Sequence, residues 1–317
     1  MNSLQQKGRL FKSYKIAFAV LLGILVISAI LAFTSGFESE LRYFNNSPIS
    51  IPFAITAIVT LALAVSSLFT LKGCSTERYP EPLFRFVSIL PTIAVIRLVF
   101  HVIWSELSRL ADAAENGTEA TLDVWSMILI VAAVFSVIYN LLEIFNLNKI
   151  LRMISGLMQI IFCIVAIAKL YIDFSIELNS PIKLLLQFSA AAMILCTLSD
   201  LRGELDIPNA TIFSLSRICS ASLGLVSAAA LFAEILPSAD KYADYYSVYA
   251  LVFIAYGIKS AAEFFSASIG SANNFKNEII LEIQEEEPGI IEENDSNTDP
   301  SSEAEAQPES EIQTENE

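Results

Sequence analysis

The sequence has a single histidine, His101, and only four cysteines among its 317 residues. The cysteines lie in separate segments with no CxxC pair and no Cys/His spacing, so neither a zinc site nor a disulfide framework is indicated. The sequence also lacks HExxH, P-loop and GxSxG motifs, and Ser/His catalysis would have to depend on His101 alone. We therefore expect neither an enzyme activity nor a bound cofactor or metal ion.

Charged residues are also scarce, at 17% of the chain, whereas 54% of the residues are hydrophobic. The mean hydropathy of +0.57 is too high for a soluble protein and typical of a chain whose main solvent is lipid. The composition therefore predicts a polytopic membrane protein with the lipid bilayer as its principal partner.

Basic residues are absent from residues 277–317, which are rich in Glu, Ser, Asn, Pro and Gln. The formal net charge of −15 belongs to this segment, because the remaining 19 acidic residues balance the 19 Lys and Arg residues. Such a segment cannot bury enough apolar surface to fold, so we expect a disordered acidic tail in the cytoplasm. The alternative is a docking segment for a basic protein partner; a nucleic-acid partner is not expected.

Eight apolar runs are long enough to cross about 30 Å of hydrocarbon, and in lipid each must satisfy its own backbone as a helix. The runs are residues 16–33, 52–71, 84–104, 124–142, 150–171, 182–198, 212–232 and 246–265. The first lacks a clear A-x-A cleavage pattern and is expected to be a membrane helix rather than a signal peptide. The fold class is therefore all-α, with eight transmembrane helices.

The basic residues indicate the orientation of these helices. Of the 19 Lys and Arg residues, thirteen lie on the side of the N-terminus, five lie on the other side and Arg97 lies within a span. This bias predicts a multi-pass protein of the cell membrane with both termini in the cytoplasm.

Residues 71–112 and 201–240 share a layout, since each segment starts with Leu, a basic residue and Gly and ends with Ala-Asp. Similar pairs elsewhere keep the same order, which predicts an internal duplication. We expect a cytoplasmic basic N-terminus at residues 1–12, then four-helix halves at residues 13–145 and 147–267. Because four is even, the halves would be parallel repeats related by an axis along the membrane normal. The alternative is chance similarity among apolar segments.

Arg97 is the first candidate for a binding site because it lies close to the middle of the span at residues 84–104. A charge there is costly, so Arg97 is expected to face the bundle interior or a wet cavity, where it binds an anionic group or forms an internal ion pair. His101 lies one helical turn further on the same face, and the two can hold a carboxylate or phosphate; alternatively, His101 is a packing residue. Pro91 is expected to kink this helix.

Four glutamates lie at the C-terminal ends of spans in both halves: Glu106, Glu143, Glu234 and Glu263. Because an anion opposes the helix dipole there, each is expected to have a nearby cation, to be well hydrated or to tend to stay protonated. Glu106 and Glu234 are further ligand-binding candidates, and all four can instead be ordinary interfacial charges. Arg217 and Lys259, within other spans, are expected to snorkel to the interface.

Two functions fit these features. A small-solute transporter or permease for an anionic or zwitterionic solute fits the two-half plan and the positive charge near the midplane. A non-transporting assembly, regulatory or scaffold protein that binds a partner through its acidic tail fits almost as well, because packed helices with few polar residues need no pathway. The surroundings of Arg97 are expected to distinguish the two.

Overall fold

The computed structural model describes most of the chain up to residue 271. The described residues are 3–35, 37–38, 43–44, 48, 50–77, 86–117, 119, 121–145, 149–172, 180–205, 209–235 and 243–271. The chain divides into two units, Met1–Phe275 and Lys276–Glu317. The predicted tail at residues 277–317 lies outside the described residues.

Eight helices of the described part are long and apolar enough to cross a membrane, which confirms the prediction of a polytopic membrane protein. They are α1 (Ser3–Ser35), α2 (Ser50–Thr70), α4 (Ile89–Glu115), α5 (Val124–Phe145), α6 (Lys149–Ile172), α7 (Pro181–Glu204), α8 (Ala210–Ile235) and α9 (Ala243–Ser266).

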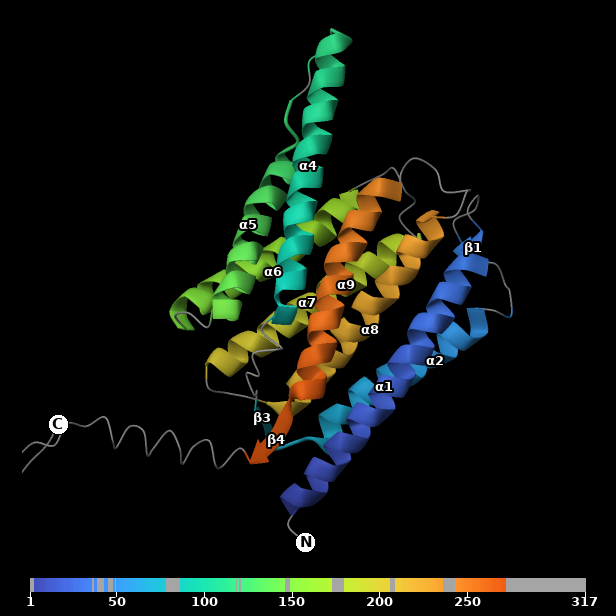
Figure 1. The fold of residues 1–317 in the computed structure, drawn as a ribbon, viewed down its shortest axis with the longest axis vertical. Helices are drawn as coiled ribbons and strands as arrows, with labels where there is room; N and C mark the ends of the chain where they lie inside the picture. Colours follow the sequence, from blue (N-terminus) through green and yellow to red (C-terminus); the bar gives the residue numbers. More distant parts are fainter. Residues whose placement is uncertain are drawn as a thin grey trace, which may run out of the picture. The chain divides into compact units, whose positions relative to one another are not determined.

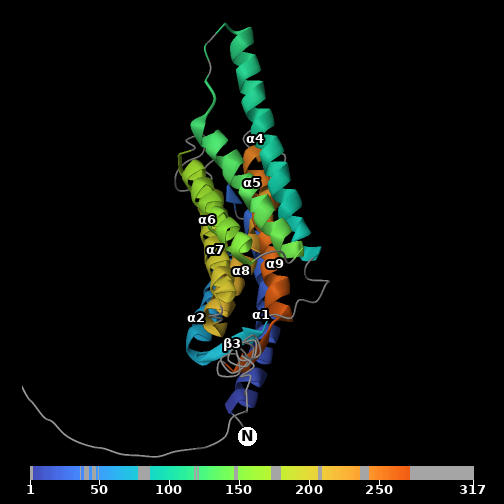
Figure 2. The same cartoon turned by 90° about the vertical axis from the view of Figure 1, so that its left-hand side faces the viewer.

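Helices α8 and α9 form the most extensive helix pair of the first unit. In Figure 1, α1 and α2 lie on one side of this pair and α4 and α5 on the other, and Figure 2 shows α6 and α7 next to each other. Helices α1 and α2 pack on α8, whereas α4 packs on α5 and α9, and α6 joins α5 to α7. The first four membrane helices are thus divided between two flanks of α8 and α9. The duplication into residues 13–145 and 147–267 stays a prediction.

The close approach of α8 and α9 depends on two glycines. A Cβ atom added to Gly224 would lie 2.8 Å from the Cα atom of Gly257, and one added to Gly257 would lie 3.0 Å from the Cα atom of Gly224. Small residues that let two backbones meet in this way are typical of membrane helix interfaces.

Helix α1 begins at Ser3, well before the expected span at residues 16–33. Its first turns are held by tertiary contacts: the Lys7 Nζ atom donates to the carbonyl of Lys72 over 2.7 Å, and the buried Phe11 ring packs edge-on against Phe264. The basic residues expected to form an N-terminal extension therefore continue the helix.

Helix α4 begins at Ile89 rather than at residue 84 and extends to Glu115, beyond the expected end at residue 104. Pro91 lies in its first turn, where a missing N–H costs no helical hydrogen bond, so the expected mid-helix kink is wrong. The added turns at the other end are stabilised by the Glu106–Arg109 ion pair at 2.6 Å, and Gly117, with φ of 67°, follows the helix.

Two short antiparallel strand pairs accompany the described helices. Strand β1 (Phe37–Glu38) pairs with β2 (Tyr43–Phe44), and β3 (Cys74–Glu77) pairs with β4 (Ser268–Ser271). The β3–β4 pair joins the segment after α2 to the segment after α9. Lys15 of α1 donates to the carbonyl of Ala267, next to β4, over 2.5 Å.

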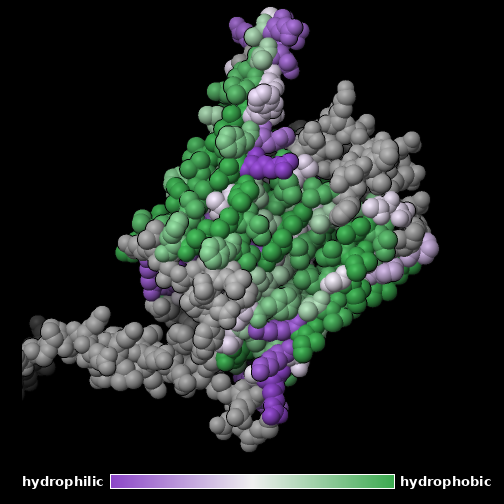
Figure 3. Space-filling view, viewed as in Figure 1, coloured by the Kyte–Doolittle hydropathy of each residue, from purple (hydrophilic) through white to green (hydrophobic). Residues whose placement is uncertain are grey.

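The outer surface of the helices is apolar along most of their length. Figure 3 shows hydrophobic residues over most of α4, α5 and α1, with hydrophilic residues at the far end of α4, part-way along α4 and at the start of α1. Large exposed side chains such as Ile58 and Phe69 on α2 belong to this surface. This distribution is the one expected for helices whose solvent is lipid.

Candidate ionic site in the helix bundle

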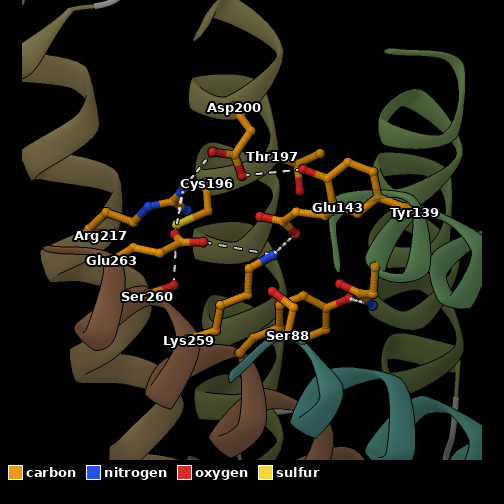
Figure 4. A network of polar contacts seen from close by, with 12 residues as sticks. Ser88, Tyr139, Glu143, Cys196, Thr197, Asp200, Arg217, Lys259, Ser260 and Glu263 are labelled. Carbon is orange, nitrogen blue, oxygen red and sulfur yellow. Dashed lines mark hydrogen bonds and ion pairs between the residues drawn. The ribbon is translucent and has the colours of Figure 1, made fainter. Parts of the chain in front are cut away.

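Five ionisable side chains from four helices meet inside the bundle (Figure 4). We call this set the ionic cluster: Glu143 of α5, Asp200 of α7, Arg217 of α8, and Lys259 and Glu263 of α9. Each residue lies within a helix segment that is apolar enough to span a membrane. The cluster forms near the C-terminal ends of α5, α7 and α9 and the N-terminal end of α8.

Arg217 links α7, α8 and α9. Its guanidinium pairs with Asp200 and, over 2.7 Å, with Glu263, and its side chain is only 2% exposed. The ring of Phe213 lies 5.2 Å from the guanidinium carbon and covers it from the same helix. The expectation that Arg217 snorkels to the interface is therefore wrong, because two carboxylates satisfy it inside the bundle.

Lys259 links α9 to α5. Its ammonium pairs with Glu143 and lies 3.9 Å from Glu263 Oε1, so Glu263 lies between both cations. The rings of Tyr139 and Tyr256 lie 5.6 and 6.0 Å from the ammonium, within the range of cation–π attraction. Lys259 is buried and does not snorkel.

The ionic cluster contains three carboxyl groups and two cations. With every group ionised, the five side chains together carry a net charge of −1. The Tyr139 hydroxyl donates to Asp200 Oδ2 over 3.3 Å, which stabilises the charge but does not cancel it. The adjacent Arg152–Glu204 pair, at 3.0 Å between α6 and α7, is balanced by itself and adds no net charge.

A layer of buried neutral polar groups lies around Tyr256. The hydroxyl oxygen of Tyr256 accepts hydrogen bonds from Asn140 Nδ2 at 2.7 Å and Gln159 Nε2 at 2.9 Å. These donors occupy both lone pairs, so the Tyr256 proton is directed to Ser136 Oγ, 3.3 Å away. Among the described residues, the amide oxygens of Asn140 and Gln159 have no hydrogen-bond partner. Buried acceptors of this kind are normally satisfied in folded proteins.

The far end of the bundle holds a second, balanced set of charges. Glu106 accepts from Arg109 at 2.6 Å and from Ser126 Oγ at 2.8 Å, which ties α4 to the start of α5. Lys169 of α6 pairs with Asp123 at 2.6 Å. Partial burial works to raise the pKa of Asp123, but the hydrogen bonds from Lys169 and Ser126 outweigh it and lower this pKa to about 2.

Arg97 and His101 lie on α4, away from the ionic cluster. Arg97 is exposed on the outer surface of the helix, and His101 is half-buried. The expectation that Arg97 faces the bundle interior is therefore wrong for the single chain, because Val95 and Leu98 occupy the buried face. The role of Arg97 and His101 as ligands stays a prediction.

Three of the four helix-end glutamates have a cation beside them, as expected. Glu106 pairs with Arg109, whereas Glu143 and Glu263 belong to the ionic cluster. The side chain of Glu234 lies outside the described part of the chain. Asp200 was not expected at all, because it follows the apolar run at residues 182–198 and hydropathy gives no sign of its burial. The sequence did contain one signal for the cluster: the cations Arg217 and Lys259 and the helix-end acids Glu143 and Glu263 lie toward the same side of the membrane.

An apolar cavity of about 250 Å³ lies between α1, α2, α7 and α8. Its walls are mostly Leu, Phe, Ala, Ile and Val side chains, with Thr60, Cys219 and Ser222 among them. Such a cavity suits hydrocarbon rather than a polar solute.

Comparison with protein-family models, curated proteins and solved structures gives no match for this chain.

Proposed function

We propose that this membrane protein is a small-solute permease whose ionic cluster is a charged gate coupled to a proton. The observation that carries the proposal is the excess of carboxyl groups over cations in the ionic cluster, three against two, inside the membrane-spanning bundle. Intramembrane ionisable groups are costly and typically mark ion pathways, proton relays and gates.

A purely structural role explains the cluster less well. Well-packed apolar residues of similar size are often as stabilising as a buried ion pair, and an unbalanced cluster adds the cost of an uncompensated charge. A proton on one carboxyl group neutralises the net charge of the cluster and removes this cost. Release of that proton would restore the charge and weaken the ion pairs that connect α5, α7, α8 and α9. Glu263 is the central group because it contacts both cations.

The solute class follows from the sign of the excess charge. The expectation of an anionic solute depended on an inward-facing Arg97, whereas the inward-facing excess charge is negative. A cationic or zwitterionic solute can replace the proton at the cluster, so we propose exchange of such a solute against a proton.

The test begins with a ligand-stabilisation screen of the purified protein at pH 5.5 and 7.5. A solute at about 100 times its Kd stabilises the folded state by about 2.7 kcal/mol, which raises the melting temperature measurably. Solutes that do so are then added to proteoliposomes that contain a pH-sensitive dye. Wild type is expected to move protons when an amine or amino acid is added.

Glu263→Gln is the diagnostic variant and Glu204→Gln is its matched control. Both glutamates lie near a helix end beside an arginine, with side chains 20% and 17% exposed. Glu263→Gln balances the cluster and should abolish solute-driven proton movement, while Glu204→Gln should keep it. Absence of stabilisation by amines, amino acids, carboxylates and phosphates would contradict the permease and favour the second candidate.

That second candidate is an assembly or scaffold protein that transports nothing. The specific observation in its favour is that Arg97 is exposed on the outer surface of α4, where a partner can reach it. The acidic segment at residues 277–317 would then offer a separate binding site for a basic protein partner.

A further inference from the structure

One face of α4 combines large apolar side chains with a charge. Ile93, Arg97, Phe100, Trp104 and Leu107 follow one another at spacings of three or four residues, so they form a single stripe, which we call the α4 face. All five are exposed, and Phe100 and Trp104 reach 69% and 72%.

The described residues leave this stripe uncovered. The opposite side of α4, with Val95, Leu98 and Val102, is buried against the rest of the bundle. Arg97 forms no ion pair or hydrogen bond with any residue of the described ranges. Its charge is therefore unmatched among the described residues.

The position of Arg97 makes this exposure costly. It lies eight residues after the start of α4, or about 12 Å along the axis, with the apolar Trp104 and Leu107 beyond it. A cation at this depth on a lipid-facing surface is unfavourable unless it meets an anion.

A second copy of this chain is a poor source of that anion. Two copies in one membrane share an orientation, and a two-fold axis along the membrane normal would bring Arg97 against Arg97 of the other copy. The exposed carboxylates of the described residues, Asp112, Glu115 and Glu119, lie at the far end of α4 or beyond it. None of these described carboxylates can reach Arg97, which points to another molecule as the source of the complementary charge.

We propose that the α4 face docks a transmembrane helix of a different protein, one that carries an Asp or Glu residue near its middle. Arg, Trp and other aromatic residues dominate the energetics of protein interfaces, and the α4 face places two aromatic rings beside its arginine. The ion pair with Arg97 fixes the depth of the partner helix, and the exposed rings of Phe100 and Trp104 supply its packing surface. This inference is independent of the ionic cluster and of transport.

The test uses Trp104 as a reporter inside the face itself. The chain has two tryptophans, so Trp125→Phe leaves Trp104 as the only one. The full-length protein is reconstituted in neutral phosphatidylcholine vesicles with a single-span Leu/Ala peptide that carries a fluorescence quencher and one central Glu. The matched peptide has Gln at the same position. The Glu peptide is expected to quench Trp104 with about tenfold higher affinity than the Gln peptide.

Variants of Arg97 decide the interpretation. Arg97→Leu should remove the preference for the Glu peptide, and Arg97→Lys should keep most of it, while Arg109→Leu, on the same helix but beyond the α4 face, should leave it unchanged. Equal binding of both peptides overturns the proposal. A preference for the Glu peptide that Arg97→Leu does not change also overturns it. A Trp104 signal that responds to anionic lipid but not to the Glu peptide overturns it as well, since Arg97 would then bind a phosphate headgroup. Self-quenching between copies labelled in the α4 face would overturn it in favour of a homodimer.

Discussion

Two arginines within membrane spans have opposite surroundings in this protein. Arg217 is buried with two carboxylates in contact, whereas Arg97 is exposed with no ion pair among the described residues. Burial of a charge is tolerated where partners are already in place, and Asp200 and Glu263 provide them for Arg217. Residue type and depth along the helix are similar in the two cases, so neighbouring helices decide which arginine turns inward.

The contribution of a buried ion pair to the free energy of unfolding can be compared with that of a more exposed one. Lys259→Met leaves Glu143 without its partner inside the bundle and is expected to lower the free energy of unfolding by about 3–5 kcal/mol. Lys169→Met removes an equivalent lysine–carboxylate pair, but Asp123 is 36% exposed, so the loss should be about 1 kcal/mol or less. Denaturation of both variants in detergent, beside wild type, measures the difference. Similar losses would show that the ionic cluster is hydrated rather than buried.

At the scale of elements, helix ends depend on contacts that a hydropathy pattern does not contain. Helix α1 starts early because Lys7 and Phe11 contact the segment after α2 and the end of α9. Helix α4 runs past its apolar segment because Glu106 and Arg109 connect it to the residues before α5. In both cases a polar stretch is helical because tertiary contacts stabilise it, which local propensity alone rarely achieves.

The α8–α9 contact should be sensitive to a single methyl group. Gly224→Ala would place a Cβ atom against the backbone of α9 at Phe253 and Gly257, and the resulting separation of the helices is expected to cost about 1–3 kcal/mol. Gly23→Ala in α1 is the matched control, because nothing lies within 4 Å of the added atom. It should be neutral or slightly stabilising, since Ala has the higher helix propensity. Thermal unfolding in detergent distinguishes the two, and equal effects would contradict the close packing.

For the first unit as a whole, helices distant in sequence are neighbours. Lys259 and Glu143 are 116 residues apart, and β3 and β4 connect the segment after α2 with the end of the described chain. The second unit begins shortly after β4, which is the last described element of the first unit.

Truncations on either side of β4 test this boundary. A chain that ends after Lys276 keeps β4 and is expected to insert and unfold like the full-length protein. A chain that ends after Ala267 leaves β3 without its partner, and the lost ladder should lower the free energy of unfolding by about 2 kcal/mol or more. Degradation or aggregation of the longer truncation would show that residues 277–317 contribute to folding.

The sequence by itself determined the number, type and approximate bounds of the membrane helices. Hydropathy is a property of consecutive residues, so the apolar runs at residues 124–142 and 150–171 need no knowledge of their neighbours to predict α5 and α6. Orientation in the membrane and the duplication remain predictions from the same source. Only the tertiary structure decided which face of each helix turns inward: Arg97 is outside, while Arg217, Lys259 and the unexpected Asp200 are inside. The physical reason is that the cost of burying a charge depends on partners contributed by other helices, and their proximity is set by packing rather than by position along the chain.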